Sequence, residues 1–301
     1  MLETASTTYS CPNCGAYVDF PAELLSTQCA FCDSPLVQED RGAKPPPGFI
    51  AKFVLDRGQA GGKLRAYFKQ AWFLPKDLEK NARPEELKGV YVPFWAIDAV
   101  ARTHYETQVG IHWYEQETYT VVENGERVTK TRTVQRTDWH PLSGSYARHY
   151  RNHLVCGSKG IPEEETNRLE PFDLGRCLEY EPAHVAGWLA EHFTVDVEKG
   201  AVTAIEEIRA EQGARLPGFL PGDCYRGLNW SSEIEPEGSR SVLLPIWIAT
   251  YRHKGEAFRL LVNGQTGSVT GSLPKDRLQP VLLAMAALLL LVVLGWLAGG
   301  V

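Results

Sequence analysis

The amino-acid sequence predicts an α+β protein with three parts: a small N-terminal β module, a larger α+β core and a single C-terminal transmembrane helix. Three observations predict this fold class: two close cysteine pairs near the N-terminus, a middle region with both strand and helix patterns, and an uncharged apolar stretch at the C-terminus. The chain has 301 residues, of which 44% are hydrophobic and 23% charged. A folded core is therefore expected without disulfide bonds.

The N-terminal module, residues 1–40, is defined by its cysteines. Cys11 and Cys14 form one CxxC pair, and Cys29 and Cys32 form a second pair after 14 intervening residues. Two pairs at this separation supply four thiolates to a tetrahedral Zn²⁺, as in a zinc ribbon, whereas a redox dithiol usually has one pair. Because four protein ligands fill the coordination shell, the predicted zinc is structural and leaves no position open for catalysis.

The charge of this module argues against nucleic acid as its partner. Residues 1–40 contain no lysine or arginine but six acidic residues, and the whole chain has a formal net charge of −6. Such a surface repels phosphate groups. We therefore expect either a protein partner or a purely structural role for the ribbon. The paired cysteines, together with a start that has no signal-peptide pattern, favour a reducing compartment.

A proline-rich linker and the core follow the ribbon. Residues 41–48 read RGAKPPPG, and three consecutive prolines favour an extended spacer. Residues 49–272 form the predicted core. In it we expect strands at 49–55, within 90–139 and within 242–270, and helices at 63–72, 76–81, 182–193 and 196–212. Asn124-Gly125, between two alternating runs, predicts a β-hairpin.

Two segments of the core resemble each other. The sequence around Pro93 reads VYVPFWAIDA, and the sequence around Pro245 reads VLLPIWIATY. Both look like strands, and each has a proline, an apolar residue and a tryptophan at the same spacing. A duplicated unit with one helical segment attached to each half explains this similarity, and the prolines would then lie at strand starts or edges. Chance explains it equally well, so the duplication stays open at this stage.

The C-terminal stretch PVLLAMAALLLLVVLGWLAGGV contains no charged residue. Residues 281–301 would form a helix of roughly 31 Å, about the thickness of the hydrocarbon core of a membrane. Lys275 and Arg277 lie in the juxtamembrane segment 273–280. The positive-inside tendency then places the rest of the chain in the cytoplasm. The predicted location is the cytoplasmic membrane, with a single pass and the bulk of the chain facing the cytoplasm.

A glycine-rich segment is a weaker candidate for a site. Residues 57–64 read RGQAGGKL, but only three residues separate Gly58 from Gly62, and Leu64 follows the lysine. A phosphate-binding loop needs four residues between these glycines and then Ser or Thr. We therefore expect a turn that leads into a helix.

The remaining histidines and cysteines do not predict a second site. His149 and His153 are spaced to share a helix face, but they lack a carboxylate motif and are expected to be surface residues. Cys156, Cys177 and Cys224 are single cysteines, expected to be small buried residues. The sequence shows no convergent acid, base and nucleophile. We therefore predict no catalytic residue, no cofactor-binding residue besides the zinc ligands, and no small-molecule substrate.

The chain as a whole resembles one bacterial family of zinc-ribbon membrane proteins. Besides the double-CxxC ribbon and the apolar terminus, the resemblance rests on the phrases WFLPKDL (72–78), LKGVYVPFW (87–95), EPFDL (170–174), LLPIW (243–247) and VNGQTGSVTG (262–271). Members are often labelled primosomal protein N′ (replication factor Y) or helicase-like. The resemblance implies companions among SPFH (flotillin-like) proteins and phage-shock membrane-stress proteins, whose placement at the membrane such relatives assist.

Three functional hypotheses follow. The first is a non-enzymatic, tail-anchored adaptor that recruits protein partners to the membrane. The second is a nucleic-acid-associated factor of replication or transcription, although a helicase needs a phosphate loop and a nucleotide fold far larger than this chain offers. The third is an enzyme with an unrecognised site in the core.

Overall fold

The computed structural model of the protein describes residues 6–15, 17–21, 24–32, 34–37, 46–70, 87–123, 125–253 and 256–271. The chain divides into two compact units. The first comprises Met1–Ala96, Leu154–Gly200 and Arg240–Val301, and the second comprises Ile97–His153 and Ala201–Ser239. Three long strands contribute residues to both units.

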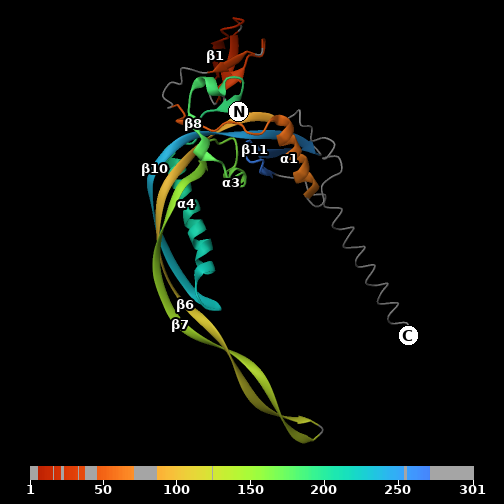
Figure 1. The fold of residues 1–301 in the computed structure, drawn as a ribbon, viewed down its shortest axis with the longest axis vertical. Coiled ribbons are helices and arrows are strands. Elements are labelled where there is room, and N and C mark those ends of the chain that lie inside the picture. Colours follow the sequence, from red (N-terminus) through yellow and green to blue (C-terminus); the bar gives the residue numbers. More distant parts are fainter. Residues whose placement is uncertain are drawn as a thin grey trace, which may run out of the picture. The chain divides into compact units, whose positions relative to one another are not determined.

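The elements of the described residues are drawn in Figure 1. In chain order they are β1 Ser6–Ser10, β2 Tyr17–Pro21, β3 Leu24–Gln28, β4 Pro35–Val37, β5 Phe49–Ile50, α1 Arg57–Gln70, β6 Lys88–Glu123, β7 Glu126–Cys156, α3 Glu163–Asn167, η2 Leu174–Arg176, β8 Leu178–Glu179, η3 Pro182–Val185, β9 Leu189–Glu191, α4 Val197–Arg215, η4 Leu216–Phe219, β10 Cys224–His253, β11 Glu256–Asn263 and β12 Val269–Gly271.

Most strands belong to one mixed sheet. Its order is β12-β11-β10-β6-β9-β3-β4, with β7 added to β6, β5 to β10 and β8 to β5, whereas β1 and β2 form a separate antiparallel pair. Strand β9 runs parallel to β6, and β5 runs parallel to β10. The short strands β5 and β9 therefore occupy equivalent positions beside the two long central strands.

Helices cover parts of this sheet through regularly spaced apolar residues. In the first unit, Ala60, Leu64 and Phe68 follow one face of α1 and pack with Leu260 and Val262 of β11. In the second unit, Ile208 of α4 is fully buried against β6 and β7 residues. Each helix thus buries one stripe and leaves its opposite face to solvent.

The two proline strands have matching surroundings in the first unit. The carbonyl of Pro93 accepts a hydrogen bond from the N–H of Gly157 (2.7 Å), and the carbonyl of Pro245 accepts one from the N–H of Gly264 (2.8 Å). A Cβ atom at Gly157 would lie 2.6 Å from the ring of Phe193, and at Gly264 it would lie 2.8 Å from the Pro245 carbonyl. Both positions therefore require glycine for close approach.

The segments that lead into the two helices are bound to these glycines in the same way. Val195, just before α4, donates its N–H to the carbonyl of the first glycine (3.0 Å), and its own carbonyl accepts the indole N–H of Trp95 (2.9 Å). Leu55, just before α1, donates its N–H to the carbonyl of Gly264 (2.9 Å). The carbonyl of Leu55 accepts the indole N–H of Trp247 (3.0 Å). The similarity seen in the sequence thus corresponds to two equivalent contact sets, each joining one strand pair to the segment that leads into a helix.

The predicted α+β fold class of the core is wrong, because one large mixed sheet dominates the described residues and helices form only a minor part. Strands β6, β7 and β10 have 36, 31 and 30 residues, far longer than the alternating runs indicated. Residues 182–193, predicted as a helix, form η3 and β9 instead. There, parallel pairing with β6 outweighs the local helix pattern, which is a weak determinant by itself.

The predicted membrane anchor is also corrected. None of the helices in the described residues is long and apolar enough to cross a membrane; the proposed span, 281–301, and segment 273–280 lie outside those residues. Length and lack of charge are necessary for a spanning helix, but they do not by themselves show that one forms. The predictions of a transmembrane helix and of a cytoplasmic-membrane location are therefore not retained.

Two local predictions, a hairpin and a helix, are confirmed by the structure. The Asn-Gly hairpin is confirmed, since β6 ends at Glu123, β7 begins at Glu126, and Gly125 between them has a φ of 87°. The predicted helix at 196–212 is confirmed as α4, Val197–Arg215. Helix α1 begins earlier than predicted, because the carboxylate of Asp56 accepts the N–H of Gln59 (2.8 Å) and the Gln59 side chain accepts the N–H of Asp56 (3.0 Å). The predicted helix at 76–81 lies outside the described residues.

We predict that Gly157→Ala and Gly264→Ala destabilise the protein by similar amounts, about 1–3 kcal/mol each, because the added methyl group overlaps a packed ring and a carbonyl. The measurement is equilibrium urea unfolding followed by tryptophan fluorescence. Gly238→Ala is the control, since its Cβ would meet no atom within 4 Å; a change within about 0.5 kcal/mol is expected there. Wild-type stability in both variants would contradict the close packing described above.

Candidate metal centre

The four cysteines of the two CxxC pairs lie close enough together to hold one metal ion. The sulfur atoms of Cys11, Cys14, Cys29 and Cys32 all lie within 4.8 Å of one another. The Sγ atoms of Cys11 and Cys32 are 3.7 Å apart, and those of Cys14 and Cys29 are 3.8 Å apart. A tetrahedron of metal–sulfur bonds of about 2.3 Å has edges of about 3.8 Å. The donor set and its spacing therefore fit a tetrahedral ion.

Each pair lies on a tight turn that its sequence favours. In the first, Gly15 adopts a φ of 73° and donates its N–H to the carbonyl of Cys11 (2.8 Å). In the second, the N–H of Phe31 points to the sulfur of Cys29 (3.5 Å), and the N–H of Cys29 is bonded to the carbonyl of Ser34 (2.9 Å). These turns direct the sulfur atoms inward.

Polar neighbours favour the thiolate form of two of the four cysteines. The hydroxyl of Ser34 lies 2.9 Å from the sulfur of Cys32, and hydrogen bonds from the side chain and backbone of Ser34 lower the pKa of Cys32 to about 6. The side-chain amide of Asn13 lies 3.7 Å from the same sulfur and donates to the Ser34 hydroxyl (2.8 Å). A backbone hydrogen bond from Cys14 likewise lowers the pKa of Cys11. Thiolates are the forms that bind metal.

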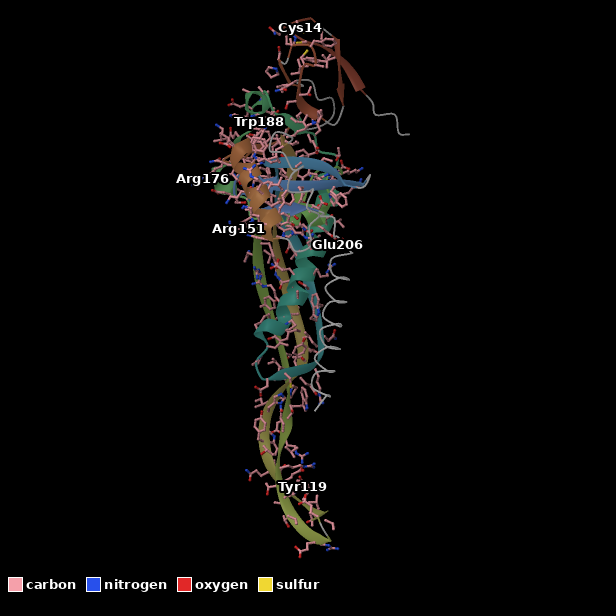
Figure 2. All side chains as sticks on the ribbon, turned by 90° about the vertical axis from the view of Figure 1, so that its right-hand side faces the viewer. Cys14, Tyr119, Arg151, Arg176, Trp188 and Glu206 are labelled. Carbon is pink, nitrogen blue, oxygen red and sulfur yellow. The ribbon has the colours of Figure 1, made fainter. Side chains whose placement is uncertain are left out.

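The four-cysteine cluster has its own small hydrophobic core and is attached to the main sheet through β3. Cys11, Cys29 and Leu36 are buried together. Strand β3, which leads directly into Cys29, pairs antiparallel with β9, and the Ser26 hydroxyl donates to the carbonyl of Trp188 (2.6 Å). Figure 2 shows Cys14 on the N-terminal module and Trp188 in the core. A metal ion that orders β3 would therefore also support the pairing of β3 with β9.

The sequence analysis did not predict the polar neighbours of the sulfur atoms, although their positions beside the two CxxC pairs indicate them. Asn13 lies between the two cysteines of the first pair, and Ser34 follows the second pair by two residues. Both positions belong to the turns and can reach a sulfur atom. Side chains of this kind orient the ligands and tune the metal.

The other sequence candidates do not assemble into a site. His149 and His153 lie on strand β7 instead of a helix, and His153 contacts the Glu207 carboxylate at 2.8 Å. Among the described residues, the four-cysteine group is the only set of three or more potential ligands close enough for a metal ion. The glycine-rich segment starts α1.

The three single cysteines differ in burial. Cys156 is buried as predicted, and burial raises its pKa to about 12, so its thiol is a poor nucleophile. Cys177 and Cys224 are only partly buried. Burial also raises the pKa of Cys177.

A second candidate surface is the far part of the β6–β7 hairpin, residues 111–123 and 126–138, which we call the β-ribbon. Strand β10 begins at Cys224, and Asp223 before it donates its N–H to the carbonyl of Gly110 (2.9 Å). Past this point, β6 and β7 pair only with each other among the described strands (Figure 1). Tyr114 and Val122 are each 68% exposed, and Trp113 and Tyr119 are also exposed.

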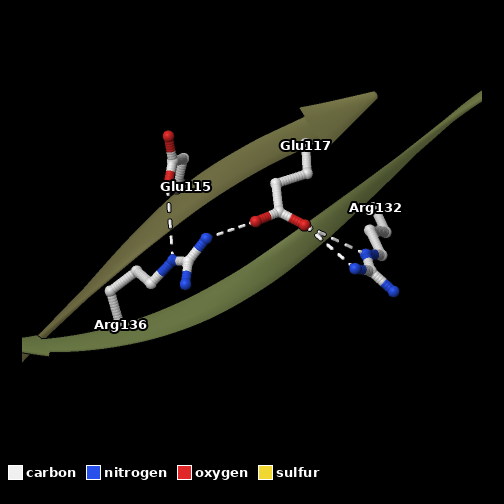
Figure 3. Close-up of polar contacts among 4 residues, drawn as sticks. All are labelled: Glu115, Glu117, Arg132 and Arg136. Carbon is white, nitrogen blue, oxygen red and sulfur yellow. Dashed lines mark hydrogen bonds and ion pairs between the residues drawn. The ribbon is translucent and has the colours of Figure 1, made fainter. Parts of the chain in front are cut away.

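Cross-strand charges occupy one face of the β-ribbon (Figure 3). Glu117 pairs with Arg132 (3.0 Å) and with Arg136, and Arg136 also contacts Glu115 (3.3 Å). Lys130 pairs with Glu123 nearer the turn. Exposed pairs contribute only about 0.2–1 kcal/mol each, so they fix the register of the strands more than they stabilise them. An isolated two-stranded ribbon is at best marginally stable in water.

Comparison with known proteins identifies no established activity. No family model and no solved structure match the chain. It is 26% identical over 235 residues to the uncharacterized protein YdjG of Bacillus subtilis strain 168. This match covers 77% of the chain but 64% of the relative, so the chain spans less than two thirds of that protein. The function is therefore inferred from the geometry of the four-cysteine cluster and of the β-ribbon.

We predict that the purified protein carries one tightly bound divalent metal ion per chain, measured by inductively coupled plasma mass spectrometry. Cys29→Ser should remove the ion, because three thiolates bind far more weakly than four, and should speed hydrogen exchange in β3 and β4. Cys224→Ser is the matched control, since this cysteine lies outside the cluster, and it should keep the full metal content. Full metal content in Cys29→Ser would contradict the site.

Proposed function

We propose that the protein is a non-enzymatic adaptor in which a structural Zn²⁺ orders the N-terminal module and the β-ribbon docks a protein partner. The observation that carries this proposal is the β-ribbon itself, which has exposed aromatic residues and no strand on its outer edges among the described residues. Unpaired strand edges are templates for strand addition.

Zinc is the metal that best suits the cysteine cluster. Four thiolates in tetrahedral spacing favour Zn²⁺ or an iron–sulfur cluster, and two CxxC turns around a small β module are typical of zinc ribbons. The four protein ligands leave no site for water or substrate, which supports a structural role. Metal analysis should therefore find zinc, in a protein without visible absorbance. Iron with absorbance near 400 nm would contradict this choice.

The open edges of the β-ribbon favour an extended segment as the docked partner, whereas its charges largely pair with one another. On the β7 side, residues 126–138 carry four cations and two carboxylates, whereas on the β6 side residues 111–123 carry three glutamates and no lysine or arginine. A partner strand that adds to an outer edge of the β-ribbon gains main-chain hydrogen bonds along that edge. Apolar side chains of the partner would pack on Trp113 and Tyr119.

The test begins with affinity purification of the full-length protein and identification of bound proteins. SPFH (flotillin-like) proteins, the class implied by the sequence resemblance, are the first candidates for reconstitution with purified components. We predict that Trp113→Ser/Tyr119→Ser weakens the reconstituted complex at least tenfold in surface plasmon resonance, since exposed aromatic anchors dominate interfaces.

Val202→Ser is the control for this experiment. Val202 lies on α4 and is 56% exposed, so its substitution removes exposed apolar surface outside the β-ribbon. Wild-type affinity is expected for this variant. Equal weakening by Val202→Ser, or wild-type affinity in the double variant, would contradict docking on the β-ribbon.

Nucleic-acid binding, the alternative hypothesis, is tested separately. Because residues 1–40 have no lysine or arginine and the net charge is −6, we predict no salt-sensitive binding of duplex DNA or single-stranded RNA at 50 mM salt, measured by fluorescence anisotropy. Micromolar binding that weakens steeply between 50 and 200 mM salt would favour the nucleic-acid hypothesis instead.

A further inference from the structure

A pocket of about 600 Å³ opens in the first unit and has no role in the adaptor function proposed above. Its wall combines residues from distant parts of the chain: Thr27 and Gln28 at the end of β3, the start of α1, the start of β6, and the loop before β9. A volume of this size accommodates a small organic ligand or the end of a peptide.

Two tryptophans form an aromatic corner in this pocket. The rings of Trp188 and Trp247 have centroids 5.9 Å apart and planes at 70°. Behind them, Phe53 stacks on Trp188 with centroids 4.3 Å apart. A Cβ atom at Gly89 would lie 2.4 Å from the Trp188 ring, so glycine allows this ring to seat against β6. The corner is therefore fixed before any ligand binds.

The indole N–H of Trp247 is already bonded within the protein. It donates to the carbonyl of Leu55 (3.0 Å) and is therefore not available to a ligand. Trp247 is buried, whereas Trp188 is partly exposed. Such a corner suits an aromatic or large apolar group, which can stack on one ring and meet the edge of the other.

The charged residues of the pocket favour a single negative charge. Arg57 and Lys88 line the pocket, are exposed, and form no ion pair with another described residue. Asp56 also lines it, and its carboxylate is engaged by the N–H of Gln59. Two cations and one carboxylate leave one net positive charge. A monoanion fits this balance better than a phosphate dianion.

We infer that this pocket binds a carboxylate attached to an aromatic or large apolar group. The apolar group occupies the Trp188–Trp247 corner, and the carboxylate pairs with Arg57 and Lys88. Such a group comes either from a free small acid or from the C-terminal residue of a peptide. The inference is independent of the adaptor function, because none of its residues belongs to the β-ribbon.

The test uses the full-length protein and a matched pair of probes in isothermal titration calorimetry. N-acetyl-L-phenylalanine carries the carboxylate, and N-acetyl-L-phenylalaninamide lacks it. The acid should bind with a Kd of about 1 mM or tighter, as expected for a fragment of this size, and at least about tenfold more tightly than the amide. A pentapeptide ending in phenylalanine distinguishes the two sources: tighter binding than the acid indicates a peptide terminus, and equal binding a free acid.

Paired variants assign the binding to this pocket. Arg57→Gln/Lys88→Gln should weaken acid binding at least about tenfold, whereas Lys52→Gln/Arg65→Gln, which removes two exposed cations outside the pocket, should leave it unchanged. Thermal unfolding confirms that both double variants are folded, as expected for exposed positions. Equal affinity for acid and amide, equal effects of the two double variants, or no binding of the acid at 10 mM would overturn the inference.

Discussion

Two indole N–H groups bind main-chain carbonyls at the entrances of the two helices, and the rest of the first unit depends on these contacts. Trp95 holds the segment before α4, and Trp247 holds the segment before α1. In each case a glycine carbonyl from a neighbouring strand end binds the N–H groups of the same segment. Because buried main-chain groups without partners cost free energy, each segment is confined to this one position.

These contacts place the elements that carry the candidate sites. They bring β9 beside β6 and β5 beside β10, both in parallel. Strand β9 then offers its other edge to β3, the strand that ends at Cys29. The same arrangement places Trp188 against Phe53 and Trp247, which forms the aromatic corner of the pocket. The N-terminal module and the pocket thus both adjoin strands whose neighbouring helix entrances are held in this way.

Local chemistry made the cysteine cluster and several turns predictable. Ligand spacing depends on short-range geometry, so two CxxC pairs suffice to predict four sulfur atoms in one place, as the distances show. The hairpin at Gly125 and helix α4 follow equally local signals. The start of α1 was predicted too late, at residue 63, although Asp56 and Gln59 have the spacing of a capping arrangement.

The remaining features depend on contacts between distant residues, which a single sequence does not reveal. Residues 182–193 have a helix-like pattern, but pairing with residues about one hundred positions earlier makes part of them a strand. Ser26 contacts Trp188 across 162 positions. The membrane helix was predicted from the length and lack of charge of residues 281–301. None of the described helices can span a membrane, and that segment lies outside the described residues.

The low stability expected of an isolated β-ribbon supports the proposal that it docks a protein partner. Its strands are held in register by exposed ion pairs such as Glu117–Arg132, and no described hydrophobic cluster includes its residues. A fixed register lowers the entropy cost of adding another strand, while weak intrinsic stability leaves much to be gained from it. Catalysis needs the reverse, a rigid frame around convergent groups. An element that is aligned but poorly stabilised is therefore better suited to docking a protein than to holding a reaction site.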